Sequence, residues 1–167
     1  TIGIGTATIT WSDPAEIFFG DTLGATQLNA TTNSDGAVTY TPAAGTALGV
    51  GTHTLHVDVA ATANYTAASK DVTIVVGKAT QTITWSNPAA IVYGTALSET
   101  QLNATTSADG ALTYTPAAGT VLGAGTRTLH VDAAATANYI AAGKDVTIAV
   151  GKATPTITWS DPAAIGY

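Results

Sequence analysis

Apolar and polar residues alternate along two long stretches of the chain. In residues 52–59, Leu55, Val57 and Val59 alternate with polar side chains, and residues 71–76 continue the same alternation. A period of two places successive side chains on opposite faces of a β-strand. Each stretch therefore predicts a strand with one buried face. Helical periodicity is absent, so we expect an all-β protein with almost no helix.

Two shorter stretches, residues 27–31 and 37–40, show the same alternation and predict two further strands. Between them lies Asp35-Gly36, a dipeptide that favours the positive φ angles of a tight hairpin turn. Proline has no amide donor and is expected at strand ends or sheet edges. The inward residues of these strands are predicted to be Leu28, Ala30, Val38 and Tyr40. The prolines predicted to end strands are Pro14 and Pro42, and the second repeat is predicted to have the same turn at Asp109-Gly110.

The chain repeats itself with a period of 74 residues. Trp11 recurs as Trp85 and again as Trp159, and the intervals 85 − 11 and 159 − 85 are equal. A repeat of about 70 residues can close a small core, so it predicts a domain rather than one turn of a solenoid. The predicted boundaries are 1–5 for the end of a preceding repeat, 6–78 for repeat 1, 79–152 for repeat 2 and 153–167 for the opening segment of a third repeat.

About six short strands per repeat favour an immunoglobulin-like β-sandwich. The junction between repeats, residues 76–83, contains no Gly/Ser-rich or Pro-rich spacer. We therefore expect tandem immunoglobulin-like β-sandwiches held end to end. The residues predicted to fill the interior of the first repeat are Trp11, Ile17, Phe19, Leu23, Leu48 and Tyr65, and Trp85 is predicted to repeat the role of Trp11.

Residues 156–167 copy only the opening of a repeat. They bring large apolar side chains without the partners that should bury them, and an unpaired β segment of this kind is a template for association. We expect this segment to be held by a neighbouring chain or to continue into the next repeat of a longer filament, with donor-strand exchange as an alternative. We also expect the protein to be longer on both sides. The apolar residues of the segment are Ile157, Trp159, Ile165 and Tyr167.

The composition excludes several classes of function. The net charge is −6 and only 10% of the residues are charged, so the chain lacks the basic surface that binds nucleic acid or anionic membranes. The chain has no cysteine, which excludes disulfides, thiolate zinc sites and thiol catalysis. No apolar run approaches the roughly 20 residues of a membrane span, so no membrane insertion is expected in this segment.

Four motifs occur in both repeats, and the first of them opens the third. They are Trp-Ser-x-Pro-Ala, Thr-Gln-Leu-Asn-Ala-Thr, Thr-Tyr-Thr-Pro-Ala-Ala-Gly-Thr-x-Leu-Gly-x-Gly-Thr and Thr-Ala-Asn-Tyr. Their sequence resembles the bacterial immunoglobulin-like (Big) repeats of large surface proteins and adhesins, close to MBG-like and hyalin-repeat modules. The resemblance implies an extracellular, cell-surface location and a stalk or spacer role with no common active site. Calcium-stiffened relatives carry Asp-x-Asp clusters at their junctions, whereas Lys78 and Lys152 stand here.

Two His-Asp pairs are candidates for a metal site. His56 and Asp58 share the outward face of one predicted strand, and His130 and Asp132 share that of its counterpart. Two ligands are too few for a metal ion, so we interpret both pairs as polar residues on a solvated face. His53 is replaced by Arg127 in the second repeat.

No arrangement in the chain predicts catalysis. Hydrolysis would need paired carboxylates or an activated hydroxyl, and Asp13, Glu16 and Asp21 are replaced in the second repeat by Asn87, Ala90 and Thr95. The acids present in both copies are Asp35, Asp58 and Asp71, with Asp109, Asp132 and Asp145. We therefore predict a protein that is not an enzyme, with no catalytic, cofactor-binding or metal-binding residues and no cofactors.

Lysine and asparagine residues that recur between the copies could in principle form isopeptide bonds. No glutamate recurs beside them, so we interpret these lysines as solvated; they are Lys70, Lys78, Lys144 and Lys152, and the asparagines are Asn29, Asn64, Asn103 and Asn138. The triplets that begin at Asn29, Asn64 and Asn103 fit the N-glycosylation pattern and are interpreted as unused. Tyr65 and Tyr139 are interpreted as corner residues whose hydroxyls bond nearby backbone.

The sequence thus predicts a non-catalytic structural stalk, spacer or filament-forming repeat region of a large extracellular, adhesin-like surface protein. The expected partners are neighbouring repeats of the same chain or identical chains in a filament, together with a glycan or a host or cell surface. Two alternatives remain: a multivalent array that binds glycans or proteins, in which valency supplies avidity, and an accessory region of a secreted enzyme.

Overall fold

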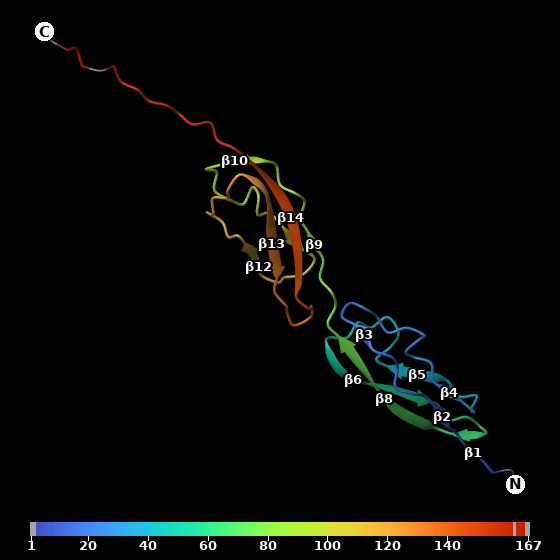
Figure 1. Cartoon of the computed structure of the whole chain (residues 1–167). Coiled ribbons are helices and arrows are strands. Elements are labelled where there is room, and N and C mark those ends of the chain that lie inside the picture. The colour runs from blue at the N-terminus through green and yellow to red at the C-terminus, as the bar shows by residue number, and fades with distance from the viewer. Residues whose placement is uncertain (1–2, 162, 166–167) are drawn as a thin grey trace. The chain divides into compact units, whose positions relative to one another are not determined.

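The computed structural model describes residues 3–161 and 163–165 of the chain. These residues form strands, turns and loops and include no helix, which confirms the all-β prediction (Figure 1). It follows that no described helix is long and apolar enough to cross a membrane.

The chain divides into two compact units. Unit 1 runs to Thr82 and includes Ala108–Gly110 and Ala134–Ala142; unit 2 comprises Ile83–Ser107, Ala111–Ala133 and the residues from Gly143 onward.

Unit 1 is built around a four-stranded sheet with the order β3-β8-β6-β5 (Figure 1). β8 runs parallel to β3 and antiparallel to β6, and β6 runs antiparallel to β5. Two short pairs, β1 with β7 and β2 with β4, complete the unit. The strands are β1 (Gly5–Thr6), β2 (Ile9–Thr10), β3 (Ile17–Phe18), β4 (Thr31–Thr32), β5 (Val38–Thr41), β6 (Gly51–Val59), β7 (Tyr65–Thr66) and β8 (Ala68–Gly77).

The core of unit 1 lies on one face of this sheet. Alternate residues of β6 and β8 are buried, as the sequence predicts, because the period of two directs them to the same side. Trp11, one residue after β2, lies over them and is only 4% exposed. Its Nε1 donates a hydrogen bond to the carbonyl of Gln27 at 3.0 Å, and its ring meets the ring of Tyr40 edge-on. The inward residues of the two strands are Leu55, Val57, Val59, Val72, Ile74 and Val76.

Unit 2 contains the second four-stranded sheet, with the order β10-β14-β13-β12, and the antiparallel pair of β11 with β9. Trp85 repeats the position of Trp11 and is 5% exposed, with its Nε1 bonded to the carbonyl of Gln101 at 3.1 Å. Both tryptophans are therefore core residues, as predicted. The strands are β9 (Ile83–Thr84), β10 (Ile91–Val92), β11 (Thr105–Thr106), β12 (Leu112–Thr115), β13 (Gly125–Ala133) and β14 (Ala142–Gly151).

The strand predicted over residues 27–31 is wrong for most of its length. The amides of Gln27 and Leu28 both donate to the carbonyl of Gly24, which closes a turn, and only Thr31 enters β4. The side chain of Gln27 reinforces the turn by accepting the amide of Gly24 at 3.0 Å. Leu28 and Ala30 still pack against the core, as does Tyr40 of β5. Val38 does not, because it opens an edge strand and is 41% exposed.

The hairpin predicted at Asp35-Gly36 is also wrong. β4 pairs with β2 and β5 pairs with β6, so the two strands that flank the dipeptide are not partners. Neither Gly36 nor Gly110 has a positive φ. A Cβ built on Gly36 would lie 2.1 Å from the carbonyl oxygen of Ala60, and one on Gly110 would lie 2.3 Å from that of Ala134. Glycine is therefore required here by the close approach of two backbone segments.

Two of the predicted interior aromatic residues lie outside the core. Phe19 and Tyr65 are half-buried and do not belong to the cluster around Trp11, whereas Ile17 and Leu23 are buried in it and Leu48 packs against it. The described residues of the predicted third repeat, 153–161 and 163–165, form no strand. Ile157, Trp159 and Ile165 are 87%, 87% and 94% exposed, and Tyr167 lies outside the described residues.

Candidate functional site

A histidine between two aspartates is the most organised polar group on the surface of unit 1. His56 and Asp58 both point outward from β6, as the sequence predicts, and the His56 Nε2 lies 3.2 Å from the Asp58 carboxylate. The antiparallel register of β6 with β8 sets His56 opposite Asp71. The Nδ1 of His56 is hydrogen-bonded to the Asp71 carboxylate. A third member therefore joins the predicted pair from the neighbouring strand.

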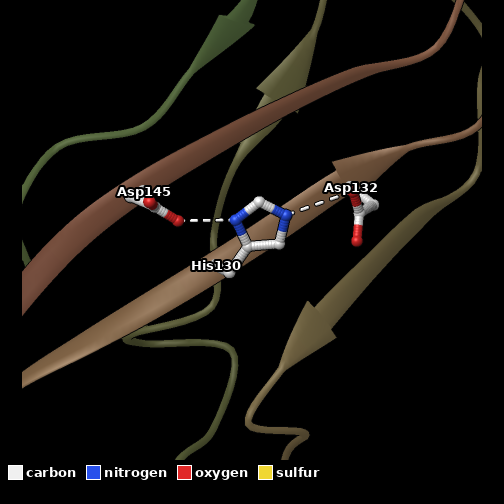
Figure 2. A network of polar contacts seen from close by, with 3 residues as sticks. All are labelled: His130, Asp132 and Asp145. Carbon is white, nitrogen blue, oxygen red and sulfur yellow. Dashed lines mark hydrogen bonds and ion pairs between the residues drawn. The ribbon is translucent and has the colours of Figure 1, made fainter.

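The same cluster occurs in unit 2, where Figure 2 shows the His130 ring between the two carboxylates. Its Nδ1 lies 2.5 Å from Asp145 of β14, and its Nε2 lies 3.1 Å from Asp132 of β13. Gly143 lies beneath the ring, since a Cβ there would come 3.1 Å from the His130 Cε1. We call these two groups the Asp-His-Asp clusters.

The clusters favour the charged form of each histidine. A carboxylate only accepts hydrogen bonds, so both ring nitrogens can donate to the two carboxylates only when the ring carries two protons, as imidazolium does. The hydrogen bond to Asp71, followed by that to Asp58, raises the pKa of His56 above 6.5. The hydrogen bonds to Asp145 and then Asp132 raise the pKa of His130 in the same way.

This arrangement limits what the clusters can do chemically. In the protonated state, both N–H groups are bonded to carboxylates and the ring has no free lone pair to coordinate a metal ion or to accept a proton from a hydroxyl. The side chains are also open to solvent, with exposed fractions of 41% for His130 and 66% for Asp145. The geometry fits a set of charge-assisted hydrogen bonds that link two adjacent strands.

The sequence contained a signal for the missing carboxylate. Asp71 follows His56 by 15 residues, and Asp145 follows His130 by the same interval. This interval brings the histidine and the aspartate together because β6 and β8 are neighbouring strands paired in a defined register. The side-chain period identifies faces, whereas the pairing of strands identifies which faces adjoin.

The clusters make the stability of the protein depend on pH. Because the folded state raises the pKa of His56 and His130, it binds protons more tightly than the unfolded state does. The stabilisation is complete below the unfolded value of 6.5 and is lost as pH rises through the higher folded value. We expect a lower urea midpoint at about pH 8.5 than at about pH 5.5, and a flatter pH profile for the double variant His56→Gln/His130→Gln.

His53 supplies a matched control for this experiment. Its Nε2 lies 2.7 Å from the carbonyl of Gly49, away from both clusters. We expect His53→Gln to keep the pH dependence of the wild type. A double variant with the slope of the wild type between the two pH values would contradict the assignment of that slope to the clusters.

Two of the acids that differ between the repeats, Asp13 and Asp21, accept backbone amides. The Asp13 Oδ1 accepts the amide of Thr73 at 2.8 Å, and the Asn87 Oδ1 accepts that of Thr147 at 3.0 Å. Aspartate and asparagine share this acceptor oxygen, which explains their exchange. The Asp21 Oδ2 accepts the amide of Phe18 across a turn.

Lys78 and Lys144, two of the four recurring lysines, bond to main-chain carbonyls. The Lys78 Nζ donates to Thr136 at 2.7 Å and the Lys144 Nζ donates to Ile83 at 3.2 Å. The asparagines of the three glycosylation triplets, Asn29, Asn64 and Asn103, are exposed.

Tyr65 and Tyr139 were predicted to bond nearby backbone through their hydroxyls. In the described part of the chain, two other tyrosines make such bonds. The hydroxyls of Tyr40 and Tyr114 donate to the carbonyls of Ala30 and Ala104. Tyr65 and Tyr139 instead receive support at their amides, which donate to the hydroxyls of Thr62 and Thr136.

A shallow polar cavity of about 350 Å³ lies beside Trp11 in unit 1. The indole forms part of its wall but is almost fully buried, so its ring faces are packed in the core. Hydroxyl, amide and carboxylate groups supply most of the remaining lining, from Thr10, Ser12, Asp13, Thr26, Asn29 and Thr31, and Pro14 and Ala15 complete it. Comparison of the chain with protein-family models gave no match, and neither did comparison with curated protein sequences.

Proposed function

We propose that this chain is a non-catalytic structural repeat region, a stalk, spacer or filament-forming segment of a large extracellular surface protein. In this proposal each repeat is an immunoglobulin-like β-sandwich and successive repeats lie end to end. The supporting observation is that the interior is built twice with the same contacts. Trp11 and Trp85 each bond a glutamine carbonyl and each meet a tyrosine ring edge-on at 5.4 Å.

The polar chemistry of the chain agrees with this proposal. Each Asp-His-Asp cluster has no ring nitrogen free for acid-base work while its histidine is protonated, and it joins two neighbouring strands of one sheet. Hydrogen bonds of this kind between adjacent strands stabilise each sheet. An array of repeated modules with few charges is suited to holding a distal domain at a distance.

A glycan-binding array is the second candidate, because the cavity beside Trp11 is lined with groups that hydrogen-bond sugars. Carbohydrate sites usually add an exposed aromatic face on which a sugar ring can pack. Trp11 is 4% exposed and offers no such face. The structural role is therefore favoured.

Small-angle scattering of the dilute full chain tests the proposal. The longest strands of a repeat have 9 and 10 residues, which at about 3.3 Å per residue gives a module roughly 30–35 Å long. Two modules in line should give a rod-like distance distribution with a maximum of roughly 60–70 Å. A compact, single-peaked distribution little wider than one module would overturn the end-to-end arrangement.

A further inference from the structure

An early segment of each repeat runs parallel to the last strand of the same repeat. In unit 1, β3 lies beside the end of β8, with Ile17 opposite Val76 and Phe18 opposite Gly77. The amide of the next residue, Phe19, donates to the carbonyl of Gly77 at 2.9 Å. The early segment is therefore bonded directly to the strand by which the chain leaves the repeat.

A side chain extends this contact toward the start of the early segment. The Asp13 Oδ1 accepts the amide of Thr73 at 2.8 Å, so residues 13 to 18 follow residues 73 to 77 in the same direction. The ring of Phe18 lies against Gly77, since a Cβ there would come 3.1 Å from the ring carbon Cδ1. We call the contacts between residues 13–19 and residues 73–77 the parallel clamp.

Unit 2 contains the same parallel clamp. β10 runs parallel to the end of β14, with Val92 opposite Gly151, and the amide of Tyr93 donates to the carbonyl of Gly151 at 2.8 Å. The Asn87 Oδ1 accepts the amide of Thr147 at 3.0 Å. The aspartate and the two phenylalanines of the first repeat are replaced here, yet the same positions are bonded. The clamp thus depends on strand direction and backbone bonds more than on particular side chains.

The direction of the strands decides how tension acts on them. Tension along the backbone enters the early segment at Asp13 and enters β8 at Gly77, which are opposite ends of the parallel clamp. One segment is then pulled lengthwise along the other, so all the bonds between them are strained together. β6 and β8 differ, because they are antiparallel and Gly51 at the start of one lies opposite Val76 near the end of the other. Force applied to those adjoining ends breaks the bonds one after another.

The rest of the sheet moves with β8. This strand is paired with all 9 residues of β6, and its inward side chains Val72, Ile74 and Val76 are buried in the core. The early segment is therefore the part that must slide when the repeat is stretched. Forced unfolding is governed by the barrier to unfolding, and breaking several bonds at once raises that barrier.

We propose that the parallel clamp is the part of each repeat that resists stretching, and that this chain carries tension along its backbone. The inference rests on the proposed structural role and adds the transmission of force to it. It assigns to the early segment a task that the conserved core contacts of Trp11 and Trp85 do not perform, because those contacts do not link the early segment to the last strand through backbone bonds.

Single-molecule force spectroscopy of the full chain tests the proposal with two directions of pulling. The chain has no cysteine, so two introduced cysteines define the points of attachment. Ser12→Cys with Thr80→Cys pulls the clamp lengthwise, whereas Gly49→Cys with Thr80→Cys peels β6 from β8. All three positions are exposed, and nothing lies within 4 Å of a Cβ added at Gly49. We expect unit 1 to unfold at a several-fold higher force in the lengthwise direction, and equal forces in the two directions would overturn the proposal.

Substitution of Asp13 separates the clamp from general stability. Asp13→Ala removes the acceptor of the Thr73 amide, so it should lower the lengthwise force and leave the peeling force unchanged. Asp13→Asn is the matched control, because Asn87 accepts the equivalent amide in unit 2, and it should keep the force of the wild type. Asp13 is preferred to Phe19 for this test, since the Phe19 ring also meets the Tyr139 ring edge-on at 5.6 Å. An equal drop in both directions would assign the effect to overall stability and count against the clamp.

The result does not depend on the end-to-end arrangement of the repeats, because all the attachment points lie in unit 1. The ratio of the two unfolding forces decides whether the clamp resists stretching. The scattering profile of the dilute chain decides the spacer arrangement separately, so failure of one proposal is distinguishable from failure of the other.

Discussion

Replacing Trp85 with alanine is expected to lower the unfolding free energy of repeat 2 by roughly 3–5 kcal/mol. The side chain is 5% exposed and packs among Leu97, Leu129 and Ile148, so its removal leaves a cavity that the sheet cannot fill. The loss also removes the hydrogen bond to the carbonyl of Gln101, which is then left without that donor. A domain of this size holds only about 4–11 kcal/mol in total, so much of the stability of the repeat depends on this one side chain.

The third tryptophan is a control with the same residue type and the same neighbours in sequence. Trp159 also lies in an Ile-Thr-Trp-Ser segment but is 87% exposed. Trp159→Ala should leave the unfolding midpoint unchanged. Trp85→Ala should also leave the transition of repeat 1 in place, because the core clusters around Trp11 and Trp85 share no residue. Guanidinium unfolding followed by circular dichroism measures both variants, and equal midpoints for the two would contradict the assignment of Trp85 to the core.

The length of each strand determined how well the sequence could predict it. β6 and β8 contain 9 and 10 residues, enough for several cycles of apolar and polar positions, and their buried faces followed directly. β2, β4 and β9 contain two residues each, which is too short to show any period. Such strands exist because their neighbours place them, and that information is held in tertiary contacts rather than in local pattern.

The turn at residues 24–28 shows a different limit. The alternation of Leu28 and Ala30 with polar residues is real, and both side chains do pack on the core. The backbone nevertheless turns, since the side chain of Gln27 bonds the amide of Gly24 and two further amides converge on the Gly24 carbonyl. Side-chain hydrogen bonds to nearby backbone compete with strand formation, and a hydropathy pattern does not register them.

The sequence alone could predict only part of the Asp-His-Asp cluster, because a local pattern shows which residues share a face of one strand but not which strands are neighbours. His56 and Asp58 are two residues apart on one strand, so the period alone places them on one face. Asp71 lies on another strand and joins them only through the register of β6 with β8. The contact between Phe19 and Tyr139 was beyond prediction, because it depends on how a loop of the second repeat packs in unit 1.

Replacing Gly36 with alanine should destabilise repeat 1 at or above the upper end of the roughly 1–3 kcal/mol usual for overpacking. The added Cβ would lie 2.1 Å from the Ala60 carbonyl oxygen and 3.1 Å from its carbonyl carbon. A flexible side chain could rotate away, but these atoms belong to the backbone, and the amide of Ala60 is bonded to the carbonyl of Ala37 at 3.0 Å. Relief of the clash therefore requires the segment after β6 to separate from the segment before β5.

Two further glycines make this experiment specific. Gly110→Ala should have the same effect in repeat 2, since its Cβ would lie 2.3 Å from the Ala134 carbonyl oxygen. Gly49→Ala is the control, because nothing lies within 4 Å of its added Cβ and its φ is not positive. It should be neutral or slightly stabilising, as alanine restricts the unfolded chain more than glycine does. Urea midpoints of the three variants decide the matter: if Gly36→Ala were as stable as Gly49→Ala, the two backbone segments could not approach as closely as the structure shows.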